Sequence, residues 1–213
     1  LNPSNSTRAH YLEIIGDKVL VISGEGQTIF FKNKNIFNDR LDQKKILNNI
    51  DDLMTESTIK FIGLRDLFVE NGKVYISVLF QDEKGYSFNI YNADLDYKKL
   101  NFEIFFETKT YFKKWSVSTG GRIEKFKDNK ILFTYGYSRV PGSAQDKNSL
   151  LGKIFSIDVN TKDYELVSIG HRNPQGLVYD KDLDLVINAE HGPKGGDEIN
   201  FNFLKENKIP NYG

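Results

Sequence analysis

The stretch LFVENGKVYISV, residues 67–78, consists of two short apolar runs joined by the pair Asn71-Gly72. An Asn-Gly pair favours the positive φ angles of a type I′ turn, whose twist matches that of the two strands it joins. The flanking residues are rich in Val, Ile, Tyr and Phe, which are typical of strands. The stretch therefore predicts a β-hairpin.

The same plan recurs three more times along the chain, in residues 12–22, 123–133 and 176–187. The four hairpins begin near residues 12, 67, 123 and 176, at intervals of 55, 56 and 53 residues. A fixed period of this size with several strands in each repeat is typical of a β-propeller, whose blades are four-stranded antiparallel sheets. At this period, the 213 residues hold about four blades.

Further strand-like runs between the hairpins supply the remaining strands of each blade; they are residues 28–31, 87–91, 153–158 and 164–167. One short helix is predicted over residues 41–54, where Ile46, Ile50 and Leu53 fall at helical spacing. The turn that starts at Asp180 lacks the Gly and the Glu that an EF-hand needs at its sixth and twelfth positions, which favours a hairpin turn. No linker interrupts the pattern, so we expect an all-β chain with one partial propeller domain over residues 1–213.

The composition excludes several classes of protein. The chain has 29 basic and 29 acidic side chains, and this balance argues against a dedicated binder of nucleic acid. It has no Cys, which excludes disulfides, thiolate nucleophiles and Cys-ligated metals. No run approaches the ~18 apolar residues of a membrane helix, so we do not expect the chain to be embedded in a membrane.

Two polar, glycine-bearing loops flank the fourth hairpin: GHRNPQG at residues 170–176 and EHGPKGGDEIN at residues 190–200. Arg172 offers a planar fork for a carboxylate, and Asn173 offers a donor and an acceptor. Asp197 and Glu198 are hard oxygen ligands, and main-chain carbonyls at the Gly-Pro turn could add more, which suits Ca²⁺. On the chemistry alone, the alternative that the loops only satisfy each other's hydrogen bonds stays open.

These two loops, together with NYG at residues 211–213, resemble the glucose/sorbosone dehydrogenase family, the soluble quinoprotein aldose dehydrogenases. Weaker matches cover GGRI at 120–123 and the stretch from AQD at 144–146 to LGK at 151–153, and a faint one covers GLRD at 63–66. The resemblance implies a six-bladed propeller that binds pyrroloquinoline quinone (PQQ) over Ca²⁺ at one mouth of its channel. About four of those six blades would be present here.

The resemblance also assigns roles to individual residues. It implies that Arg172 and Asn173 contact the quinone and that the main-chain oxygens of Gly192 and Pro193 coordinate its Ca²⁺. A second, structural calcium site would use Asp197, Glu198 and the backbone of Tyr212.

Two positions depart from the family pattern. The family's general base is a His placed two residues before Gly-Gly-Arg, and that position is Ser118 here. Loss of a general base costs about 10²–10⁴ in rate, unless another group such as His191 replaces it. The family's cofactor-contacting Gln falls on Phe61.

The resemblance therefore implies a PQQ- and calcium-dependent dehydrogenase that oxidises a sugar at its anomeric carbon, with activity in question because of Ser118. One alternative is a non-catalytic, calcium-stabilised propeller that binds a sugar or a protein partner, and another is a structural propeller without a ligand. By analogy we expect a periplasmic or secreted protein, compatible with a homodimer, that passes electrons to an acceptor the sequence does not identify.

Overall fold

The computed structural model describes residues 9–32, 43–55, 59–204 and 208–213, and nearly all of its regular structure is β-strand. The chain forms two compact units. The first contains the residues up to Asp82 together with Asn89–Glu107, and the second contains Glu83–Phe88 together with Thr108–Gly213. The all-β prediction is confirmed, and the assignment of the whole chain to a single domain stays a prediction. Among the described residues, no helix has the length and apolar character needed to cross a membrane.

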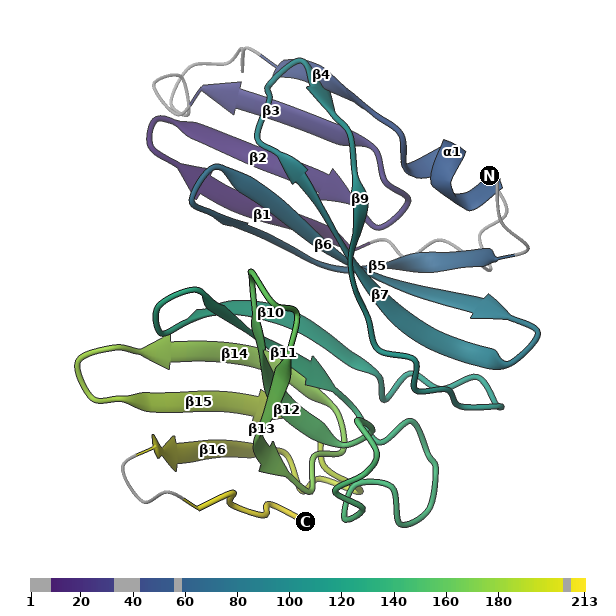
Figure 1. Cartoon of the computed structure of the whole chain (residues 1–213), viewed down its shortest axis with the longest axis vertical. Coiled ribbons are helices and arrows are strands. Elements are labelled where there is room, and N and C mark those ends of the chain that lie inside the picture. Colours follow the sequence, from purple (N-terminus) through teal and green to yellow (C-terminus); the bar gives the residue numbers. More distant parts are fainter. Residues whose placement is uncertain (1–8, 33–42, 56–58, 205–207) are drawn as a thin grey trace. The chain divides into compact units, whose positions relative to one another are not determined.

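Two sheets make up most of the first unit (Figure 1), except that the start of β7, up to Phe88, belongs to the second unit. One has the antiparallel strands β1 (His10–Ile15), β2 (Lys18–Ser23), β3 (Thr28–Lys32) and β4 (Gln43–Asn48), with β8 (Lys99–Leu100) parallel to β4. The other has β5 (Lys60–Glu70), β6 (Lys73–Asp82), β7 (Gly85–Asp94) and β9 (Glu103–Glu107). Leu20 and Ile22 of the first sheet and Val74 and Ile76 of the second belong to one buried cluster, so the apolar faces of the two sheets share a core.

The four predicted hairpins are all present. The first two are β1–β2 and β5–β6, and the other two, described below, open the two sheets of the second unit. Asn71 and Gly72 have φ angles of 49° and 72°, as a type I′ turn requires. In the turn after Asp180, the Asp180 carboxylate accepts the N–H groups of Asp182 and Leu183 at 3.0 and 2.9 Å. That carboxylate therefore stabilises a turn, in agreement with the preference for a hairpin over a metal loop.

The helix predicted over residues 41–54 is wrong for most of its length. Residues 43–48 form strand β4, and only Ile50–Thr55 are helical, as α1. The amides in the middle of the stretch explain the break, because they bind nearby backbone instead of continuing a helix. Asn48 Oδ1 accepts the N–H of Ile50 at 3.1 Å, and Asn49 exchanges two hydrogen bonds with the backbone of Phe102.

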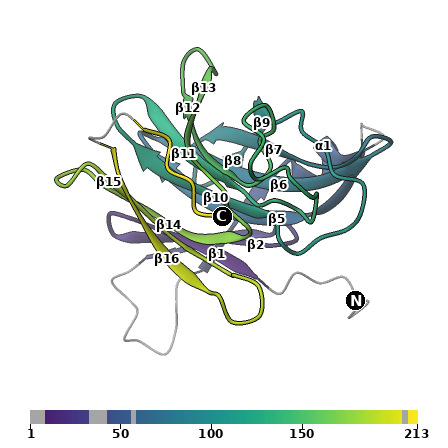
Figure 2. The ribbon, with the colours of Figure 1, turned by 90° about the horizontal axis from the view of Figure 1, so that it is seen from below.

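The second unit also contains two sheets. One has β10 (Gly120–Phe126), β11 (Lys130–Tyr135), β12 (Lys153–Asp158) and β13 (Tyr164–Ile169). The other has β14 (Pro174–Asp180), β15 (Leu185–Glu190) and β16 (Glu198–Phe203), which Figure 2 shows as adjacent strands. Leu132 and Ile154 of the first sheet and Val186 of the second belong to one buried cluster.

The antiparallel register of the second sheet places the two conspicuous loops together. Pro174 at the start of β14 pairs with Glu190 at the end of β15, and Glu190 pairs with Glu198 at the start of β16. The loop before β14 and the loop after β15 therefore lie at the same end of the sheet. This is the part of the fold that positions the candidate site.

Candidate functional site

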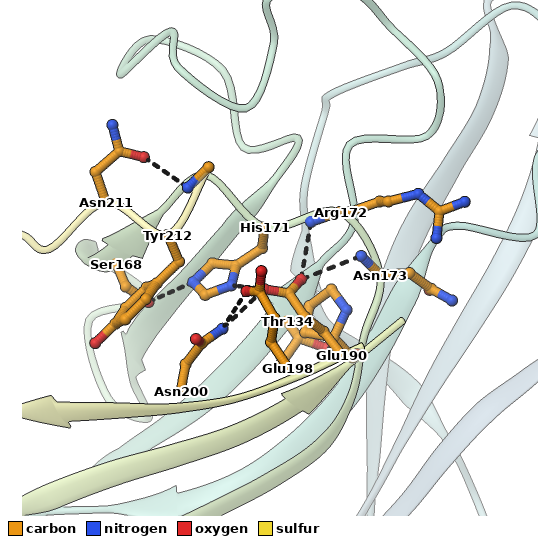
Figure 3. A network of polar contacts seen from close by, with 12 residues as sticks. Thr134, Ser168, His171, Arg172, Asn173, Glu190, Glu198, Asn200, Asn211 and Tyr212 are labelled. Carbon is orange, nitrogen blue, oxygen red and sulfur yellow. Dashed lines mark hydrogen bonds and ion pairs between the residues drawn. The ribbon is translucent and has the colours of Figure 1, made fainter. Parts of the chain in front are cut away.

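A buried carboxylate, Glu190, stands at the centre of the site (Figure 3). The residue is 6% exposed, and its Oε2 accepts the main-chain N–H groups of Arg172 at 2.8 Å and Asn173 at 3.3 Å. Its Oε1 accepts a hydrogen bond from Asn200 Nδ2 at 2.9 Å and lies 3.1 Å from His171 Nδ1. Four polar groups thus surround the carboxylate, which offsets the cost of burying its charge.

His171 connects this carboxylate to the neighbouring sheet. The side chain is fully buried, and its Nε2 lies 2.7 Å from Ser168 Oγ on β13. With the proton on Nδ1, that nitrogen donates a hydrogen bond to Glu190 and Nε2 accepts one from the Ser168 hydroxyl, so both ring nitrogens are satisfied. The Tyr212 ring lies against the imidazole, with ring centroids 5.5 Å apart. Burial raises the pKa of the Tyr212 hydroxyl, which donates to the carbonyl of Phe201 at 2.8 Å.

Arg172 spans the gap between the two loops. Glu190 fixes its backbone, and its Nη1 donates to the carbonyls of His191 at 2.7 Å and Gly192 at 2.8 Å. The Gly192 position has no room for a side chain, because a Cβ atom would overlap the Gly196 carbonyl. The loop after β15 is therefore folded tightly enough to present two consecutive carbonyls to one guanidinium nitrogen.

A cavity of about 400 Å³ lies beside this contact. It is lined by Tyr137, Ala144, Gly170, His171, Arg172, Glu190, Gly192, Pro193, Glu198, Tyr212 and Gly213. Five of the residues that the sequence singled out, namely Arg172, Gly192, Pro193, Glu198 and Tyr212, are thus brought together.

Asn173, Asp197 and both candidate bases, Ser118 and His191, do not line this cavity. Asn173 is buried, and its Oδ1 accepts hydrogen bonds from Gly120 N at 3.2 Å and Gln175 Nε2 at 2.8 Å. Asp197 lines a neighbouring cavity of about 500 Å³; its Oδ1 accepts the N–H of Gly192 at 3.0 Å, and its Oδ2 lies 3.5 Å from His191 Nδ1.

The oxygens predicted for calcium do not form an open shell as arranged. The Gly192 carbonyl accepts Arg172 Nη1, and the Pro193 carbonyl accepts the N–H of Gly196 at 3.1 Å. A guanidinium on one of these oxygens repels a divalent cation at the same place. The described part of the chain also contains no group of three or more His, Asp or Glu side chains arranged to hold a metal. The calcium ligands therefore stay a prediction.

The candidate bases differ sharply in accessibility. Ser118 is 1% exposed, so its hydroxyl is shielded from solvent. Its carbonyl accepts the N–H of Ser138 at 3.0 Å. The His191 side chain is 63% exposed. Phe61, which the resemblance aligns with the family's Gln, packs against the core of the first unit.

Lys153 organises one wall of the cavity, and sequence reasoning assigned it no role. Its side chain is fully buried, and Nζ donates to the carbonyls of Ser143, Ala144 and Leu151 at 2.8, 2.9 and 2.8 Å. Burial lowers the pKa of this ammonium to about 8, while Asp146 acts in the opposite direction. The LGK stretch in the weaker family match was the signal that could have identified it. Glu190 and Ser168 were missed as well, because a pattern does not show which carboxylate or hydroxyl is buried.

The family model for glucose/sorbosone dehydrogenase matches residues 12–213. An uncharacterized protein from Synechocystis sp. is 31% identical over 176 residues, a match that covers 71% of this chain and 42% of that protein. The chain therefore spans less than half the length of this curated relative.

Several solved structures share the fold. A glucose dehydrogenase superposes with a TM-score of 0.73 at 21% identity, covering 95% of this chain and 62% of that one. The soluble aldose sugar dehydrogenase of Escherichia coli in its apo form superposes with a TM-score of 0.68 at 19% identity, covering 89% of this chain and 59% of that one. The PQQ-bound aldose sugar dehydrogenase of Streptomyces coelicolor superposes with a TM-score of 0.68 at 20% identity, covering 98% of this chain and 62% of that one. Together with the repeated antiparallel sheets, these matches confirm a β-propeller fold with about four blades present.

Proposed function

The chain belongs to the glucose/sorbosone dehydrogenase family, and on that premise we propose that it oxidises an aldose at the anomeric carbon with PQQ and calcium as cofactors. One observation carries the proposal: Arg172 lines a cavity of about 400 Å³ while Glu190 holds its backbone. When bound, the quinone supplies the electron acceptor.

In this proposal, Arg172 binds the acidic edge of the quinone. A guanidinium pairs with carboxylates through parallel hydrogen bonds, so it suits a ligand that carries several carboxylates. The Glu190 carboxylate fixes the main chain at both Arg172 and Asn173, which reduces the conformational freedom lost when a ligand is bound. Asn173 is proposed to reach the quinone with its amide nitrogen, because Gly120 and Gln175 already donate to its oxygen.

The calcium part of the proposal rests on the loop after β15. Gly192 and Pro193 would contribute main-chain oxygens at the quinone, and Asp197, Glu198 and the backbone of Tyr212 would form the second site. Glu198 and Tyr212 line one cavity, which favours a shared role, whereas Asp197 would have to turn from its contact with the N–H of Gly192.

We propose His191 as the group that accepts the proton from the sugar's anomeric hydroxyl. Its ring is exposed, and its Nδ1 lies 3.5 Å from Asp197 Oδ2, a carboxylate that can orient it. Ser118 is unsuited to this role because a buried hydroxyl with a pKa far above neutrality neither meets the substrate nor takes its proton.

Ser118 also favours the second candidate, a propeller that binds a sugar or a protein partner without oxidising it. Activity separates the two candidates. The protein is mixed with PQQ and Ca²⁺, quinone binding is measured by calorimetry, and dye reduction is followed with a panel of aldoses. Turnover supports the dehydrogenase, tight quinone binding without turnover supports the binding protein, and no quinone binding rejects the cofactor assignment.

Two variants test the base. We expect His191→Ala to lower turnover by about 10²–10⁴ and Ser118→His to raise it. Arg139→Gln, a change on an exposed loop of the same unit, serves as the control and should leave turnover unchanged. Equal turnover in wild type and His191→Ala would reject His191 as the base.

The proposal includes a periplasmic or secreted location. Transfer of electrons to an acceptor and assembly into a homodimer stay predictions. Cell fractionation with an antibody against the protein tests the location, and a purely cytoplasmic signal would contradict it.

A further inference from the structure

The loop between β9 and β10, residues 108–119, presents an aromatic side chain to solvent. Trp115, the single Trp of the chain, is 47% exposed, and Val117 is 65% exposed. The Trp115 ring lies against Tyr86, with ring centroids 5.5 Å apart, and Tyr86 in turn stacks on Phe112 at 5.3 Å. A large ring that other rings hold in place and that stays open to solvent is a platform for the apolar face of a ligand.

The backbone around this ring is fixed to the β6–β7 turn. Tyr86 and Phe112 exchange two main-chain hydrogen bonds of 2.9 and 3.0 Å. Lys113 Nζ donates to the carbonyl of Lys84 at 2.7 Å. These contacts position Trp115 before a ligand arrives, which reduces the conformational freedom lost on binding.

The loop leads directly into the neighbourhood of the candidate site. The hydroxyl of Ser116, a residue that is 1% exposed, accepts the N–H of Ser118 at 3.1 Å. The carbonyls of Ser118 and Arg172 both face Gly136, where an added Cβ atom would lie 2.4 and 2.8 Å from them. The loop that carries Trp115 and the loop that carries Arg172 are therefore neighbours within the second unit.

The loop is also basic. Residues 108–119 contain three lysines and no Asp or Glu. Two of these lysines, Lys113 and Lys114, directly precede Trp115 and are exposed. The β6–β7 turn that the loop contacts has the sequence DEK at residues 82–84, so positive charge stays in surplus. An anionic group on a ligand is therefore favoured beside the ring.

We propose that Trp115 stacks against the ring of the sugar substrate and that Lys113 and Lys114 select a sugar that carries a carboxylate, a uronic acid. The C–H groups of a pyranose form an apolar face that covers an aromatic ring, and a carboxylate on the same sugar reaches a neighbouring ammonium group. A uronic acid keeps the anomeric carbon of an aldose. Its role as the substrate rests on the proposed function, whereas its binding at Trp115 does not.

Trp115 reports this binding itself, because it is the single Trp of the chain. Tryptophan fluorescence of the wild-type protein is titrated with glucuronate and with glucose, which differ only in the group at C6. Both sugars should change the emission, and glucuronate should bind about 3–10-fold more tightly because it forms exposed ion pairs with two lysines. High salt should remove this difference. Unchanged emission at tens of millimolar glucuronate, or equal affinities for the two sugars at low salt, would overturn the proposal.

Variants of Trp115 test the stacking. Trp115→Ala should weaken glucuronate binding, measured by titration calorimetry, on the order of 10-fold. Trp115→Phe should retain most of the affinity, because a benzene ring also stacks on a sugar. An equal loss in both variants, or no loss in Trp115→Ala, would contradict the stacking.

Lysine variants test the selection of the carboxylate. The double substitution Lys113→Gln and Lys114→Gln should remove the preference for glucuronate and leave glucose binding unchanged. Lys181→Gln is the matched control, because this exposed lysine lies in the β14–β15 turn, at the other end of that hairpin. The control should keep the preference, and a preference that survives in the double variant would overturn the proposal.

Dye reduction with PQQ and Ca²⁺ separates this inference from the proposed function. If glucuronate binds as expected but no sugar is oxidised, the proposed function fails and the acidic-sugar site stands. If aldoses are oxidised but glucuronate leaves the Trp115 emission unchanged, this inference fails and the proposed function stands.

Discussion

Replacing Glu190 by Gln should destabilise the second unit far more than the same change at Glu198. The substitution keeps the size of the side chain but exchanges one carboxylate oxygen for an NH₂ group. Placed at Oε2, that group would face the N–H groups of Arg172 and Asn173, donor against donor. Placed at Oε1, it would face Asn200 Nδ2 and His171 Nδ1. The Oε2 placement leaves two donors without their acceptor. The Oε1 placement leaves Asn200 Nδ2 without its acceptor, because the His171 ring can take its other tautomer and accept from the new NH₂ group.

The expected magnitude follows from these contacts. A buried donor that loses its acceptor costs about 1–3 kcal/mol, so the loss of one or two acceptors lowers the free energy of unfolding by about 1–6 kcal/mol. That is a large part of the ~5–15 kcal/mol that stabilises a typical domain. Glu198 pairs with Glu190 across the strands but is exposed, and Glu198→Gln should change stability by no more than about 0.5 kcal/mol.

Urea denaturation followed by tryptophan fluorescence measures this difference, because Trp115, the only Trp of the chain, lies in the second unit. The unfolding free energy of each variant is obtained by linear extrapolation to zero urea and compared with that of wild type. The comparison requires that the slope of the free energy against urea concentration is the same in all three proteins. If the unfolding free energies of Glu190→Gln and Glu198→Gln differ by less than about 0.5 kcal/mol, the reasoning about the buried carboxylate is refuted.

Three further predictions concern other parts of the second unit. The pKa of Lys153 is about 8 in the folded state and 10.5 ordinarily, so the unfolded chain binds more protons between these values and the stability contributed by Lys153 rises with pH. The unfolding free energy of wild type minus that of Lys153→Met should therefore increase by about 3 kcal/mol from pH 8 to 10.5, and a flat difference would contradict this. Among the described residues, Asn188 Nδ2 is a buried donor without a partner, so Asn188→Leu should leave stability unchanged or raise it by about 1 kcal/mol in urea denaturation. Asn202→Leu, which removes a bond of 3.0 Å to the Val167 carbonyl, should instead lower stability by about 1–3 kcal/mol, and equal effects would count against the assignment. Gly192→Ala should displace the loop after β15 and raise the rate of amide hydrogen exchange at residue 192, while exchange at Leu132 in the core stays slow.

The hairpins could be predicted from the sequence because local chemistry decides them. Asn71-Gly72 favours one turn geometry, and the apolar runs on either side are rich in residues that favour strands. The helix over residues 41–54 failed for a tertiary reason, since Ile46 is buried as part of a strand and Asn49 binds the backbone of Phe102 from a distant part of the chain. Helical spacing alone cannot reveal either contact.

The location of the candidate site could be predicted from the sequence, but the contacts of its side chains could not. The two glycine-bearing loops identified the end of the β14–β15 hairpin, and the structure brings them to one cavity. The sequence does not reveal that Glu190 is the buried carboxylate, because Asp197 and Glu198 are equally acidic and only the register of β15 and β16 separates them. It also does not reveal that the Arg172 side chain turns toward main-chain carbonyls, since these carry no sequence signal.

Within the described residues, the hydrogen bonds that run from Ser168 through His171 and Glu190 to Asn200 do not pass through Ser118. The groups that hold the loops are thus separate from Ser118, the position to which the resemblance assigns the base. A substitution at residue 118 can remove chemistry without weakening this network, so selection for a stable fold does not protect the base.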